Sequence, residues 1–96
     1  KLAGKPAAVF SASTSMHGGQ ESTLLTMMLP LLHHGMLIVG LPYTETALFD
    51  TKTGGSPYGV TRLTDDLEAT PLSDDERTLC LAIGKRVATI AKKLSS

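Results

Sequence analysis

Residues 4–21 read GKPAAVFSASTSMHGGQE, in which an apolar run gives way to a glycine-rich loop. The apolar run, Ala7–Phe10, follows Pro6 and ends at Ser11. A short, continuously apolar run of this kind is typical of a parallel strand buried on both faces. Residues 11–19 are small, polar and rich in glycine, which predicts a loop at the carboxyl end of that strand.

A helical period follows the loop and begins at Gln20. Proline in a helix interior loses one hydrogen bond and clashes with the preceding turn, so at Pro30 we expect a kink or the start of a second short helix. Gly35 is well placed to be the left-handed residue that closes the helix. One apolar stripe runs along this helix, formed by Leu24, Leu25, Met28, Leu29 and Leu32.

The second apolar run, Met36–Val39, is ended by Gly40 and Pro42 and predicts a second buried strand. The order strand, loop, helix, strand is that of a parallel crossover unit. Residues 41–72 show no sustained periodicity, and we predict a long loop there, of the kind that is usually functional or part of an interface.

The final helix has the clearest signals. Ser73 precedes three acidic residues, and together with Glu76 it predicts a capping box at the helix start. The chain of 96 residues is expected to be one unit, residues 1–96. The apolar stripe of this helix is formed by Leu79, Ile83, Val87, Ile90 and Leu94.

Composition excludes several classes of function. Nine basic and nine acidic residues give a formal charge of zero, so the field that a nucleic-acid binder needs is absent. The apolar runs are too short for a membrane span, and nothing indicates secretion, so we expect a cytoplasmic location. Cys80 is the only cysteine, which excludes an internal disulfide and favours a buried structural thiol.

The loop at residues 11–19 is the main candidate for a functional site. It leaves a parallel strand and enters a helix, which is where open α/β sheets bind ligands. An ordinary β-to-α connection explains the same pattern, and the residues alone leave both interpretations open. His33 and His34 are adjacent and diverge by about 100° on a helix, so no metal site is expected. His34 remains a candidate because it ends the helix that the loop begins.

Three motifs in order carry a resemblance to a known family. They are GKPAAVFSASTSMHGGQE at residues 4–21, LLHHGMLIVGLPY at residues 31–43 and GGSPYG at residues 54–59. Together they closely resemble the C-terminal half of the WrbA family of FMN-dependent NAD(P)H:quinone oxidoreductases. The similarity extends over essentially the whole chain.

The resemblance implies an α/β, flavodoxin-like fold with a three-layer parallel sheet of strand order 2-1-3-4-5. This chain would supply strands four and five with their helices. It also implies an enzyme that binds FMN, passes a hydride from NADH or NADPH to the flavin, and reduces quinones by two electrons. Assembly as a homodimer or homotetramer is expected.

The resemblance also assigns the site. It implies that His34 lies over the flavin pocket, where it is the candidate catalytic residue and a further cofactor contact. The family's phosphate loop follows the first strand and has no counterpart here, so we expect the chain alone to bind flavin poorly and to be inactive. The alternative is a non-catalytic interaction module that oligomerises. The implied cofactor-binding loop residues are Ser13, Thr14, Ser15, Met16, His17 and Gly18.

Overall fold

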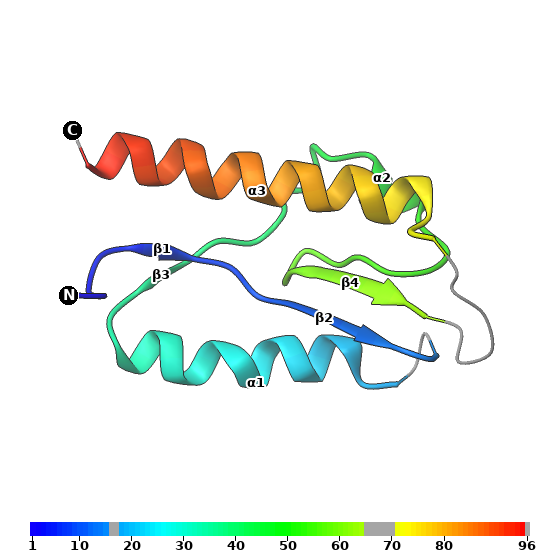
Figure 1. Cartoon of the computed structure of the whole chain (residues 1–96), viewed down its shortest axis with the longest axis horizontal. Helices are drawn as coiled ribbons and strands as arrows, with labels where there is room; N and C mark the ends of the chain where they lie inside the picture. The colour runs from blue at the N-terminus through cyan, green and yellow to red at the C-terminus, as the bar shows by residue number, and fades with distance from the viewer. Residues whose placement is uncertain (16–17, 65–70, 96) are drawn as a thin grey trace.

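The computed structural model describes residues 1–15, 18–64 and 71–95. Two long helices lie on opposite sides of a set of short parallel strands (Figure 1). This arrangement is a small α/β unit, consistent with the expected flavodoxin-like class. In chain order the elements are β1 (Pro6–Ala7), β2 (Phe10–Ser13), α1 (Gln20–His33), β3 (Leu37–Ile38), α2 (Ala47–Asp50), β4 (Val60–Leu63) and α3 (Asp74–Leu94).

β1 and β2 are successive segments of one extended stretch, and each pairs with a different later strand. β3 pairs with β1 and β4 pairs with β2, both in parallel. The carbonyls of Lys5, Ala7 and Ser13 accept the hydrogen bonds from this later part of the chain. Carbonyls two residues apart in a strand point the same way, so β3 and β4 lie end to end along a single edge.

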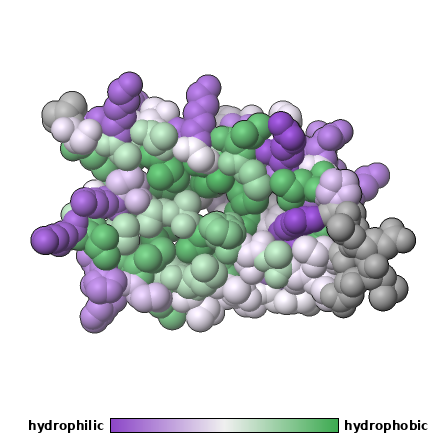
Figure 2. All heavy atoms as spheres, viewed as in Figure 1, coloured by the Kyte–Doolittle hydropathy of each residue, from purple (hydrophilic) through white to green (hydrophobic). Residues whose placement is uncertain are grey.

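The opposite edge of β1 and β2 is paired with no strand in the described part of the chain. On this side hydrophobic residues gather over the strands between the two helices (Figure 2). The side chain of Phe10 is 77% exposed. An open strand edge presents unpaired backbone donors and acceptors and is a ready template for another strand.

The first strand differs from its prediction at residues 7–10. Strand pairing occurs at Pro6–Ala7 and again at Phe10–Ser13, and of residues 7–10 only Val9 is buried. The prediction of burial on both faces was therefore wrong for this chain. The run is apolar, but among the described residues β1 and β2 each have a neighbouring strand on one edge only.

The segment at residues 41–72 contains two elements that periodicity did not predict, α2 and β4. Both have four residues, too few for a periodic pattern to emerge. The Leu41 N–H donates to the Pro57 carbonyl at 2.9 Å. This bond joins the two ends of residues 41–57, an excursion of the chain that leaves the sheet after β3 and returns to it at β4.

α1 runs without a break through Pro30, so a second short helix does not form. Gly35 has φ +76° and ends the helix as expected. Of the predicted apolar stripe only Leu24 is fully buried, whereas Leu29 is 64% exposed. Much of the apolar face of α1 is therefore uncovered.

α3 begins with the predicted capping box. The Ser73 hydroxyl accepts from the Glu76 N–H at 3.1 Å, and the Glu76 carboxylate accepts from the Ser73 N–H at 2.9 Å. Leu79 is fully buried one turn later. It belongs to the core between α3, β4 and the excursion, which consists of Leu41, Ala47, Val60 and Leu79.

Candidate cofactor-binding loop

The candidate loop begins where β2 and β4 end together. The Ser13 carbonyl accepts from the Thr64 N–H at 2.7 Å and from the Thr64 hydroxyl at 3.1 Å. Because β2 and β4 are parallel, both strands direct their carboxyl ends to this point. It is the position at which open α/β sheets bind ligands.

Two hydrogen bonds connect the described residues of the loop on either side of residues 16–17. The Ser13 hydroxyl donates to the Ser15 carbonyl at 2.6 Å, and the Gly18 N–H donates to the same carbonyl at 3.2 Å. A Cβ on Gly18 would lie 3.1 Å from Ser15 Oγ and 3.2 Å from Ser13 Cβ, tighter than ordinary contact. Glycine at residue 18 therefore allows the loop to fold closely on itself.

The start of α1 adds hydrogen-bond donors. Gly19 is the N-cap, with φ +76°, and it has no side chain to accept from the first turn. Unsatisfied N–H groups and the helix dipole favour partial negative charge at such an end. The helix start can therefore offer N–H donors to the polar edge of a ligand.

Four of the predicted loop residues lie together here: Ser13, Thr14, Ser15 and Gly18. The predictions for Met16 and His17 fall outside the described residues. The hydroxyl of Ser13 is engaged within the loop itself. The proton of this hydroxyl is therefore used inside the loop.

His34 lies at the other end of α1. It is the C-cap of the helix, it is exposed, and its ring packs edge-on against that of His33 at a centroid distance of 6.0 Å. The 14 residues of α1 span about 21 Å at 1.5 Å per residue. One chain therefore does not bring His34 to the loop at residues 13–18.

The buried carboxylate of Glu76 joins two of the elements next to the loop. Glu76 accepts from the Leu63 N–H at 2.7 Å, so α3 is joined to the end of β4. Burial alone would raise the pKa of Glu76, but hydrogen bonds from Leu63, Ser73 and Thr53 outweigh it and hold the pKa below its usual value. Glu76 thus remains ionised near neutral pH and acts as an anchor.

The remaining candidate groups add no second centre. Burial, reinforced by the Glu76 carboxylate, raises the pKa of the partly buried Cys80 thiol, so the thiol is not activated. Within residues 1–15, 18–64 and 71–95, no three His, Cys, Asp or Glu side chains gather as a metal site would require. None of the helices in the same part of the chain has the length and apolar character of a membrane span.

Fold and site together define a class: a parallel α/β unit with a donor-rich loop at the carboxyl ends of its strands. Within this class, the chain is similar in sequence to several named proteins. The chain is 48% identical over 95 residues to a protein of Methanosarcina barkeri named NAD(P)H dehydrogenase (quinone). Proteins of the same name from Syntrophobacter fumaroxidans and Methanosarcina acetivorans are 46% and 45% identical.

The match covers nearly all of this chain but only part of each relative. It includes 97%, 98% and 96% of the chain, and 46%, 47% and 45% of the respective relatives. The chain thus spans about half the length of the curated relatives it matches. No family model matches it.

Sequence reasoning missed the residues that hold the loop in place. Gln20 was seen only as the start of a helix, yet it is 7% exposed and hydrogen-bonded to two strands. Thr64 lay in a segment without periodicity. A polar residue that opens an apolar helix next to a glycine pair is the one signal that could have drawn attention to Gln20.

Proposed function

We propose that this chain forms the ring-side half of a flavin site in an FMN-dependent NAD(P)H:quinone oxidoreductase. The observation that carries the proposal is the match to NAD(P)H dehydrogenases (quinone) across nearly the whole chain. The donor-rich loop at the carboxyl ends of β2 and β4 supports it, because that loop lies where a planar cofactor would be held. FMN would supply the redox chemistry when bound, and the chain would orient it.

The geometry of the loop supports a proposed role for several of its residues. Backbone N–H groups at Thr14 and Ser15 would meet the polar edge of the ring, while Ser13 and Gly18, whose hydroxyl and N–H both donate to the Ser15 carbonyl, maintain the shape of the loop. We infer that His34 acts at a flavin held by another subunit, since α1 separates it from the loop of its own chain. The proposed enzyme is accordingly a homodimer or homotetramer with shared sites.

Flavin binding tests this proposal directly. The phosphate loop that the family resemblance implies is not in these 96 residues, so ring contacts would dominate what affinity the chain has. We expect riboflavin, which lacks the phosphate, to bind this chain as well as FMN does, with quenching of flavin fluorescence in both titrations. Binding of FMN at least tenfold tighter than riboflavin would place a phosphate site in this chain and contradict the proposed division.

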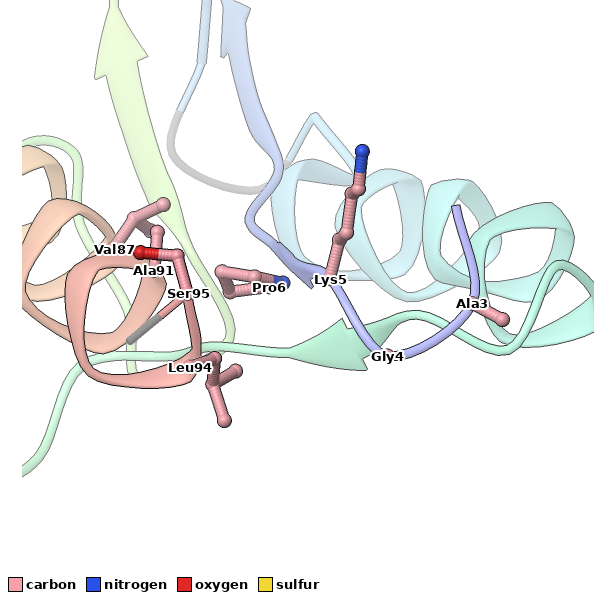
Figure 3. Close-up of a pocket in the computed structure, with 8 residues that line it drawn as sticks. All are labelled: Ala3, Gly4, Lys5, Pro6, Val87, Ala91, Leu94 and Ser95. Atoms are coloured by element: carbon pink, nitrogen blue, oxygen red, sulfur yellow. The ribbon is translucent and has the colours of Figure 1, made fainter. Parts of the chain in front are cut away.

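A second function, an interaction module without catalysis, is favoured by the open side of the molecule. Pro6 and the residues before it face the last turns of α3 across a hollow of about 490 Å³ (Figure 3). Two further hollows of about 460 and 510 Å³ involve residues of β1 and β2. These surfaces resemble a protein interior that another segment or chain would cover.

Sedimentation at micromolar concentration, combined with an absorption spectrum, separates the two functions. A colourless assembly that binds neither flavin would favour the module. A species that takes up added flavin would favour the oxidoreductase. A well-folded monomer with cooperative unfolding would contradict the expectation that the open edge requires a partner.

A further inference from the structure

Gln20 is a buried polar side chain at the first residue of α1. Its Nε2 donates to Ser13 Oγ at 2.8 Å and to the Arg62 carbonyl at 3.3 Å. Only 7% of the residue is exposed. Three segments thus meet at one amide group: the end of β2, the end of β4 and the start of α1.

The first of these bonds decides the direction of the Ser13 hydroxyl. A serine hydroxyl has one proton to donate. Because Ser13 Oγ accepts from Gln20 and donates at 2.6 Å to the Ser15 carbonyl, that proton is committed within the loop. The same Ser15 carbonyl accepts from the Gly18 N–H, so the influence of Gln20 extends along the loop to its glycine end.

We propose that Gln20 is the positioning residue for Ser13, Ser15 and Gly18, the described residues that the loop's hydrogen bonds connect. Its amide turns the Ser13 hydroxyl toward Ser15 and thereby sets the backbone that meets the ligand. The identity of that ligand, a flavin ring, rests on the proposed function, whereas the positioning role rests on the hydrogen bonds alone. Ser13 itself then contributes no donor to the ring.

The test uses Gln20→Glu in the full chain. Glutamate keeps the length and shape of the side chain but replaces the donating amide nitrogen with an acceptor, so both hydrogen bonds are lost. We expect the Gly18 amide to exchange with solvent about tenfold faster, which corresponds to about 1.4 kcal/mol. Amides in the middle of α3, such as that of Val87, should keep their rates. Glu21→Gln, a change at the exposed neighbour, is the matched control.

Two outcomes would overturn the positioning role. One is unchanged exchange at Gly18. The other is a parallel rise in α3, which would make Gln20 a general stabiliser of the fold. If the glutamate variant does not fold, Gln20→Met provides the comparison, because it removes the amide donor at a similar side-chain length and leaves the Ser13 hydroxyl in place.

Riboflavin titration separates this inference from the proposed function. Wild-type chain should bind riboflavin more tightly than Gln20→Glu. Equal affinity despite a loosened loop would overturn the link between Gln20 and the ligand. Faster exchange at Gly18 with no riboflavin binding to either protein would support the positioning role and count against the flavin.

Discussion

Glu76 connects the start of α3 to the end of β4 through one carboxylate, which accepts from the N–H groups of Ser73 and Leu63. In Glu76→Gln the amide NH₂ would face one of these N–H donors, leaving donor against donor in a buried site. We expect a loss of about 1–3 kcal/mol in the free energy of unfolding at pH 7, measured by urea titration. Glu21→Gln on the exposed face of α1 should cost much less.

The lowered pKa of Glu76 predicts how the stability difference between wild type and Glu76→Gln changes with pH. The folded pKa of Glu76 lies below its ordinary value of 4.5. Its contribution is therefore fully present above pH 4.5 and is lost as the pH falls through the lower folded pKa. The difference in stability between wild type and Glu76→Gln should shrink in acid. A difference that grows below pH 4.5 would contradict this view of Glu76.

The two histidines at the end of α1 form a matched pair for testing the catalytic assignment. In an enzyme completed with the half of the relatives that this chain does not match, His34→Ala should lower quinone turnover at least tenfold while leaving FMN affinity within about twofold, since His34 is proposed to lie at the flavin ring and away from the phosphate. His33→Ala is the control and should retain activity. Steady-state kinetics and flavin titration measure both. Loss of flavin with unchanged turnover per bound flavin would refute the placement of His34.

At the scale of elements, α3 contains Gly84, a glycine that no close contact with the described residues requires. A Cβ on Gly84 would have no described heavy atom within 4 Å outside the helix's own backbone. Glycine in a helix interior costs about 1 kcal/mol relative to alanine. Gly84→Ala should therefore raise the free energy of unfolding of the isolated chain by up to about 1 kcal/mol, as measured by denaturant titration.

Gly55 provides the opposite case. Its φ is +114°, and a Cβ there would collide with the side chain of Leu79. Gly55→Ala should destabilise the chain by more than Gly84→Ala stabilises it. A destabilising effect of Gly84→Ala would contradict the view that this position of α3 is open.

Elements with strong local signals could be predicted from the sequence, and those defined by distant contacts could not. The capping box at Ser73 and the closure of α1 at Gly35 follow from local chemistry. β4 has four residues and depends on its pairing with β2, and α2 is a single turn within a closed excursion. The loop at residues 11–19 was correctly expected between strand and helix, although β2 extends into it as far as Ser13.

The site shows the same division. The loop's composition indicated its place at the carboxyl end of a strand, and the resemblance supplied the candidate residues. The hydrogen bonds of Gln20 to Ser13 and to the Arg62 carbonyl connect residues that are 7 and 42 positions apart. The longer of these connections became visible only when β4 was placed beside β2.

At the scale of the whole molecule, both a strand edge and hydrophobic side chains are left uncovered in the described part of the chain. One edge of β1 and β2 is open in the described structure, and the exposed hydrophobic residues include Phe10, Leu29 and Leu32. The chain spans about half of its curated relatives. These features agree with a half sheet that requires further strands to bury its surface.

Quinone reduction with and without the half of a relative that this chain does not match tests the proposed division most directly. This chain would be assayed with excess FMN, NADH and benzoquinone, first alone and then mixed with the unmatched half of the Methanosarcina barkeri relative. We predict negligible turnover by either half alone, and a yellow, active complex when the two are combined. Turnover by this chain alone at the level of an intact flavoenzyme would contradict it, as would a mixture of folded halves that neither associates nor retains flavin.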